Sequence, residues 1–293
     1  MSTTVQASRT AVLVCQGRAA ADGLVVPERF ADPTAMVLLR DDERAPVEWV
    51  RDGAVPKQWT QRVDYETVRA SAELMVPRTV AIDDAVRAHP APQLVILGAG
   101  LDGRAWRMPE LADVAVFEVD QPASQRDKRD RAGALPGTPP VFVPVDFDHE
   151  RLDTALAAAG HRDDQPTTWV CEGVVPYLTR QAVADLFAAV ASRDAPGGRL
   201  IVNYQTPATA TRLGRLVARA MAASTGRKSV WAAEPWRSTW TSAAMAGLLG
   251  PLGYAVISDE GLLTAAKALG VPAHRPRSLA NGRVLVADRA AAR

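Results

Sequence analysis

The chain has 293 residues, 47% of them hydrophobic, and its 34 basic and 33 acidic residues give a formal net charge of +1. This length and apolar content favour one large α/β domain, or two modest ones, with a real core. The charge balance argues against any general attraction to nucleic acid or to an anionic membrane surface.

Cysteine and histidine are sparse. Cys15 and Cys171 are too few for a disulfide framework, which fits a reducing compartment. The histidines lack the spacing of metal ligands; they are His89, His149, His161 and His274. No apolar run approaches the roughly 18 residues of a membrane span, and 11–15 is too short for a signal-peptide core. We expect a soluble cytoplasmic protein without a metal site, and its oligomeric state stays open.

The first part of the chain predicts helices broken by prolines. Small and apolar residues favour a helix over Arg9–Ala21, and three prolines then interrupt the following stretch: Pro27, Pro33 and Pro46. A loose helical period marks Tyr65–Arg87, where Pro77 should kink or divide the helix. Residues 1–90 are therefore interpreted as an N-terminal helical extension.

Short apolar runs alternate with helical patterns across residues 91–205. The expected strands are Leu94–Leu97, Val114–Val119, Val141–Val145, Thr167–Cys171 and Leu200–Asn203. The expected helices between them are Pro122–Ala132, Glu150–Ala159 and Gln181–Ala191. This alternation predicts a parallel sheet covered on both faces. Ligands of such sheets bind beyond the carboxyl ends of the strands.

The pattern changes after Asn203. A helix is expected over Thr209–Ala223 with a basic side, followed by a tryptophan-containing loop over Thr225–Thr239; the residues of interest are Arg212, Arg215, Arg219, Trp231, Trp236, Arg237 and Trp240. The later elements expected are a helix over Ala243–Leu252, a strand over Tyr254–Ile257, a helix over Leu262–Leu269 and a strand over Gly282–Ala287. We interpret 206–250 as a helical insertion and 251–293 as C-terminal strands of the same single domain.

A glycine turn follows the first expected strand directly, with the sequence Gly-Ala-Gly-Leu-Asp-Gly over 98–103. Glycines allow a sharp turn and a close approach of a ligand, and the next helix offers free N–H groups. Taken alone, the pattern is as compatible with a loop that merely needs glycine.

Acidic residues follow the later strands. Asp120 lies 20 positions after Gly100 and suits the two hydroxyls of a ribose, with Glu118 as a competing candidate and a helix cap as the alternative role. Asp146 and Phe147 suit the amine and the ring of adenine, although Asp146 by itself fits a turn or cap residue better. Glu172 is either a turn acid or a partner for an ammonium group.

Together these carboxylates favour one cofactor class. Acids at three strand ends would repel the pyrophosphate of a dinucleotide. S-adenosylmethionine has no phosphate and carries a ribose, a sulfonium and an α-ammonium. The pattern therefore indicates S-adenosylmethionine.

A family resemblance rests on six stretches in order. They are Val-Pro-Arg-Thr at 76–79, Val-Ile-Leu-Gly-Ala-Gly-Leu-Asp-Gly-Arg-Ala-Trp-Arg at 95–107, Phe-Glu-Val-Asp-Gln-Pro at 117–122, Val-Pro-Val-Asp-Phe at 143–147, Cys-Glu-Gly-Val-Val-Pro-Tyr-Leu at 171–178 and Val-Asn-Tyr-Gln at 202–205. With them the chain resembles the leucine carboxyl methyltransferase family, which includes protein phosphatase methyltransferases and polyketide O-methyltransferases. The resemblance implies a class I methyltransferase sheet, Rossmann-like and mostly parallel, with a C-terminal antiparallel strand, and a helical lid insertion after the fifth strand.

The resemblance also implies roles for residues. Arg78 would hold the methionine carboxylate, and Tyr177 would orient the methyl acceptor, although a core tyrosine is the simpler reading. The remaining cofactor-binding residues it implies are Gly98 and Gly100 along the cofactor, Asp120 at the ribose, Asp146 and Phe147 at adenine, and Glu172 at the methionine end. Arg18 is the nearest match to a basic cofactor-contacting residue in the first helix. Many methyltransferases carry an acid two residues before the first glycine, where this chain, like the family, has an apolar residue, Ile96.

The resulting hypothesis is an S-adenosylmethionine-dependent O-methyltransferase of secondary metabolism, acting on a carboxylate or hydroxyl of a small molecule. The arginines and tryptophans of 206–250 are candidates for the acceptor pocket, with a solvated helix face as the alternative. Other functions also stay open: an NAD-type oxidoreductase, a binding protein without turnover, and a methyltransferase for protein C-terminal carboxylates.

Overall fold

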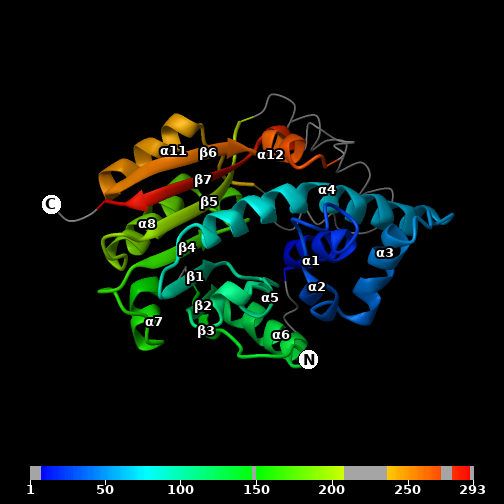
Figure 1. Cartoon of the computed structure of the whole chain (residues 1–293), viewed down its shortest axis with the longest axis horizontal. Coiled ribbons are helices and arrows are strands. Elements are labelled where there is room, and N and C mark those ends of the chain that lie inside the picture. The colour runs from blue at the N-terminus through cyan, green and yellow to red at the C-terminus, as the bar shows by residue number, and fades with distance from the viewer. Residues whose placement is uncertain (1–7, 147–149, 208–235, 272–278, 291–293) are drawn as a thin grey trace.

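Seven strands form one sheet in the order β3-β2-β1-β4-β5-β7-β6 (Figure 1). The computed structural model describes residues 8–146, 150–207, 236–271 and 279–290. The strands are β1 Gln93–Leu97, β2 Ala115–Asp120, β3 Val141–Pro144, β4 Thr167–Cys171, β5 Arg199–Gln205, β6 Tyr254–Gly261 and β7 Gly282–Arg289. Strands β1 to β5 pair in parallel, whereas β7 pairs antiparallel with both β5 and β6. The predicted sheet, mostly parallel with one antiparallel C-terminal strand, is confirmed.

The helices cover both faces of this sheet. They are α1 Arg9–Ala21, α2 Pro33–Val37, α3 Asp41–Arg51, α4 Trp59–Arg87, α5 Arg104–Arg107, α6 Pro122–Ala132, α7 Leu152–Ala158, α8 Arg180–Ser192, α11 Ser242–Leu249 and α12 Leu262–Ala268, with short 3₁₀ turns η1 Pro109–Leu111, η2 Val175–Tyr177 and η3 Gly250–Leu252. One buried cluster joins α1, α4 and α12 to the sheet, and the other joins α7, α8 and α11 to its opposite face.

Alternation of side chains along the strands explains why there are two cores. Leu94 and Ile96 of β1 belong to the core beneath α1 and α4, while Val95 and Leu97 belong to the core beneath α7 and α8. All five residues of β1 are buried, as expected for a parallel strand covered on both faces. In Figure 1 helix α4 runs across the sheet toward α1 and α3.

The N-terminal region departs from the sequence predictions. Pro33 begins α2, a position that favours proline because its missing N–H is not needed there. Pro46 lies at the middle of α3, and the helix continues through it. Pro77 was expected to kink or divide its helix, but α4 runs through it as one 29-residue helix. The predicted division is therefore wrong. Burial of Pro77 against the core offsets the lost backbone bond.

Several predicted bounds are reproduced. α1, α6 and β4 begin and end where the sequence placed them, and β6 extends four residues beyond the predicted strand. The predicted helix Thr209–Ala223 and nearly all of the loop Thr225–Thr239 lie outside the described residues. No helix in the described part of the chain is long and apolar enough to cross a membrane.

Candidate functional site

The glycine turn lies at the carboxyl end of β1, between the ends of β2 and β4. Gly98 and Gly100 have φ of +63° and +48°, which is the left-handed region that favours glycine. The register of the parallel strands brings the ends of β1, β2 and β4 level with one another. The turn and the acids that follow those strands therefore share one edge of the sheet.

Asp120 contacts this turn directly. Its Oδ2 accepts the N–H of Gly100 at 2.6 Å, and its Oδ1 accepts the N–H of Gln121 at 2.7 Å. Asp120 thus contacts both the glycine turn and the start of α6, whose N-cap residue, Gln121, makes no capping bond with its own side chain. Burial raises the pKa of Asp120, and these two N–H groups oppose that rise.

Glu118, the competing candidate, is buried inside the protein and paired with a lysine. It is fully buried, and Lys128 Nζ of α6 lies 2.5 Å from its Oε2. Burial raises the pKa of this carboxyl to about 7 against the opposing effect of Lys128. Of the two acids of β2, Asp120 is therefore the one placed for a ligand.

Asp146 follows β3 next to Asp120. The N–H of Val145 donates to the carbonyl of Asp120 at 2.9 Å, which ties the two strand ends together. The Asp146 side chain is half-buried, and Glu150 Oε2 accepts its backbone N–H at 2.8 Å. Phe147, predicted to pack on adenine, lies outside the described residues.

Arg78 of α4 meets Glu172 after β4. Arg78 Nε lies 2.7 Å from Glu172 Oε1, and both side chains are about nine-tenths buried. Residues 94 positions apart in the sequence are thereby brought together beside the glycine turn. A guanidinium and a carboxylate facing one another form a matched pair for the two charges of an α-amino acid.

The remaining sequence candidates lie around this pair. Arg18 of α1 donates to Leu101 O in the glycine turn at 2.6 Å and pairs with Asp32 at 2.7 Å. Ile96 is buried in the core, as its apolar character predicts. Tyr177 is half-buried on η2, five residues after Glu172.

Sequence reasoning did not single out the charged residues that support the site. Asp83 of α4, Asp102 of the turn, and Arg104 and Arg107 of α5 form a buried ion-pair network with Glu172, Arg18 and Asp32. Four arginines and four carboxylates balance in it: Arg18, Arg78, Arg104 and Arg107 against Asp32, Asp83, Asp102 and Glu172. The two arginines in the stretch 95–107 could have indicated this network. Their partners Asp83 and Glu172 could not be identified, because they lie far away in the sequence.

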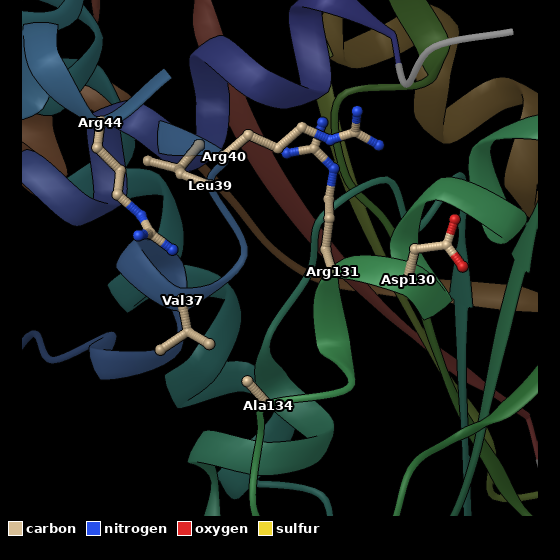
Figure 2. Close-up of a pocket in the computed structure, with 7 residues that line it drawn as sticks. All are labelled: Val37, Leu39, Arg40, Arg44, Asp130, Arg131 and Ala134. Carbon is tan, nitrogen blue, oxygen red and sulfur yellow. The ribbon is translucent and has the colours of Figure 1, made fainter. Parts of the chain in front are cut away.

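The concavity in Figure 2 is a different place. It has a volume of about 390 Å³ and lies between the α2–α3 region and α6, lined by Val37, Leu39, Arg40, Arg44, Asp130, Arg131 and Ala134. None of the residues that the resemblance assigns to the cofactor lines it. Arg131 is held by Asp127 and Glu43, so its charge is already compensated.

The model of the leucine carboxyl methyltransferase family matches residues 11–191. A relative from Mycolicibacterium vanbaalenii is 33% identical over 201 residues, 67% of this chain and 65% of the relative. One from Mycolicibacterium paratuberculosis is 32% identical over 215 residues, 70% and 69% of the two chains. Both are provisionally named S-adenosyl-L-methionine-dependent methyltransferases. The match thus spans about two thirds of the length of these relatives.

Two solved structures share the fold. A provisionally assigned methyltransferase from Thermobifida fusca aligns over 99% of this chain and 97% of its own, with a TM-score of 0.53 and 16% identity. A Bordetella parapertussis protein aligns over 99% and 100%, with a TM-score of 0.54 and 15% identity. At these identities the likeness concerns the fold alone.

Proposed function

Because the chain belongs to the leucine carboxyl methyltransferase family, we propose that it transfers the methyl group of S-adenosylmethionine to a carboxylate oxygen of a small acid. The observation that carries the proposal is the Arg78–Glu172 pair beside the glycine turn. It offers opposite charges at one place to the carboxylate and the ammonium of the cofactor.

The residues present fit this cofactor. Among residues 8–146, 150–207, 236–271 and 279–290, the Arg78 guanidinium bonds through Nε alone, to Glu172. Its two Nη nitrogens are thus left for a ligand carboxylate, the geometry in which arginine binds best. Asp120 supplies acceptor oxygens for ribose hydroxyls, and Asp146 supplies one for an adenine amine. Among the described residues, Arg18, Arg104 and Arg107 beside the turn are paired with carboxylates, which disfavours the pyrophosphate of a dinucleotide.

The cofactor supplies a methyl group already activated on a sulfonium, so the protein chiefly aligns the acceptor and excludes water. Arg78 and Glu172 would fix the methionine end, and Asp120 would fix the ribose. Tyr177, close after Glu172, is our candidate for orienting the acceptor through its hydroxyl.

The placement of the two described histidines, His89 and His161, is compatible with a carboxylate acceptor. His89 and His161 bond Thr168 and Thr167 at the amino end of β4, the edge opposite to Glu172. Burial, helped by Arg193, lowers the pKa of His161 to about 4. A hydroxyl acceptor needs a base near the methyl group, whereas a carboxylate is already ionised at neutral pH. His149 and His274 lie outside the described residues.

The chain that returns from the insertion borders the same edge. Arg237 N donates to Pro176 O at 2.7 Å, Ser238 Oγ donates to Val175 O at 3.0 Å, and Trp240 N donates to Gln205 O at 2.9 Å. These bonds attach the end of the insertion to η2 and to the end of β5. They support the assignment of 206–250 to the acceptor side of the site.

Two measurements test the proposal. Calorimetric titration of the folded protein with S-adenosylmethionine is expected to show one site, with no heat from NADH; absence of binding would reject the cofactor. Radiolabelled methyl transfer to aromatic carboxylic acids is expected to give esters, which release labelled methanol in alkali. Alkali-stable label on hydroxylated analogues would instead identify a hydroxyl acceptor, and label on peptide C-termini a protein substrate.

A further inference from the structure

Arg104 contacts carboxylates from three separate parts of the chain. Its Nε lies 2.7 Å from Asp83 Oδ1 of α4, and its Nη1 bonds Asp102 Oδ2 of the glycine turn and lies 2.9 Å from Glu172 Oε2. The Arg104 side chain is 2% exposed. With Nε and Nη1 bonded to protein carboxylates and almost all of its side chain buried, Arg104 offers little surface to a ligand.

Glu172 is bonded to two arginines, Arg78 and Arg104, which differ in their remaining partners. Arg78 bonds Glu172 Oε1, and its two Nη nitrogens have no described partner. Arg104 bonds Glu172 Oε2 and is itself bonded to Asp83 and Asp102. A ligand carboxylate would bind the two Nη nitrogens of Arg78 and so compete with Glu172 for its charge. Arg104 would then be the cation that stays with Glu172.

The charges around Glu172 indicate what this second cation contributes. Arg78 of α4, Arg104 of α5 and Arg18 of α1 face it with positive charge, and Asp102 of the turn faces it with negative charge. Burial by itself raises the pKa of a carboxyl here, but Arg78 and Arg104 outweigh that effect and lower it. Loss of Arg104 would raise the pKa of Glu172, and the protonated form attracts an ammonium group less strongly.

We propose that Arg104 is a positioning residue that keeps Glu172 ionised and oriented for the ammonium of the cofactor while Arg78 serves the cofactor's carboxylate. This inference rests on the proposed function. It adds a specific role for the arginine that follows the glycine turn. The role is exerted through Glu172, and Arg104 itself does not touch the cofactor.

Arg107 provides a matched control. It lies on the same helix, its side chain is 5% exposed, and it bonds Asp83 at 2.7 Å and 3.0 Å, but none of its observed partners is Glu172 or Asp102. Arg104→Met and Arg107→Met therefore each remove one buried cation from Asp83. An effect that acts through Asp83 would be common to both variants.

The experiment is a calorimetric titration with S-adenosylmethionine from about pH 5 to about pH 8, on wild type, Arg104→Met, Arg107→Met and Glu172→Gln. The Arg104→Met substitution is expected to raise the pKa of Glu172. Below that new pKa, the affinity of the variant should fall about tenfold per pH unit relative to the wild-type profile. Arg107→Met is expected to keep the wild-type profile. Glu172→Gln is expected to bind weakly, without this dependence. Thermal unfolding checks that each variant is folded, and Arg104→Lys replaces Arg104→Met if the latter is not.

Each outcome separates the two proposals. Binding by wild type together with a wild-type pH profile in the Arg104 variant overturns the role of Arg104 alone. Equal changes in the Arg104 and Arg107 variants also overturn it. Absence of binding by folded wild type rejects the proposed function itself, and this inference with it.

Discussion

Asp120 Oδ2 accepts the backbone N–H of Gly100 at 2.6 Å, so the acid at the end of β2 is bonded to the glycine turn at the end of β1. The two residues are 20 positions apart. This bond fixes the Asp120 carboxylate at the point where the cofactor's ribose is proposed to bind.

Asp120→Asn is expected to weaken S-adenosylmethionine binding by about 2 kcal/mol, or about thirtyfold in Kd. Asparagine has the same shape, but its oxygen can accept only one of the two backbone N–H groups that now donate to Asp120. Its NH₂ group faces the other N–H, which loses its acceptor. Calorimetric titration measures the change. Asp130→Asn, on the exposed side of α6, is the control and should bind like wild type. Unchanged affinity in Asp120→Asn would remove Asp120 from the site.

Gly98→Ala is expected to destabilise the fold by about 2–4 kcal/mol. The left-handed φ of +63° costs about 1–2 kcal/mol for alanine, and the added Cβ would lie 2.4 Å from Val174 Cγ2, which adds an overpacking cost. Adding Val174→Ala removes the collision but not the backbone cost, so the double variant should recover only part of the loss. Urea unfolding tests this. Equal stability of the single and double variants would contradict the contact with Val174.

Gly17→Ala tests the packing of α1 on α4. A Cβ at Gly17 would lie 2.4 Å from Ser71 Oγ and 2.9 Å from the Ser71 carbonyl carbon, so the helices must separate. We expect a loss of about 1–3 kcal/mol in the free energy of unfolding. Gly247→Ala in α11 is the matched control, because nothing lies within 4 Å of its Cβ position. That variant should be neutral or more stable by up to about 1 kcal/mol.

Glu118 predicts a pH dependence of stability. Burial raises its pKa from the usual 4.5 to about 7, and its Oε1 is buried without a hydrogen-bond partner among the described residues. The folded protein thus retains this proton over an interval in which the unfolded chain releases it. The contribution to stability is present below the unfolded value and is lost as pH rises from about 4.5 through about 7.

Urea unfolding across that interval checks this prediction. Relative to wild type, Glu118→Gln should lose the decline, since the amide does not titrate and other groups contribute equally to both proteins. A decline of the same size in both proteins would assign it to other residues.

The sequence alone determined the fold class and the edge of the sheet that carries the candidate site. Five apolar runs separated by helical patterns specify a parallel sheet, and the carboxyl ends of parallel strands meet at one edge. Gly98, Gly100, Asp120 and Glu172 were therefore predictable as neighbours from local pattern. Proline was misjudged, because Pro46 and Pro77 lie inside helices whose packing overrides local preference, whereas Pro33 begins a helix.

Only the tertiary structure decided which charges meet. Nothing in local sequence pairs Arg104 with Asp83 or Glu118 with Lys128, because these contacts arise when separate elements pack and buried ions must be compensated. The third glycine of the turn shows the same limit. A Cβ at Gly103 would lie 1.9 Å from Thr34 Oγ1, so this glycine makes room for α2. Local pattern specifies the elements and their shared edge, whereas long-range packing selects the partners of each buried charge.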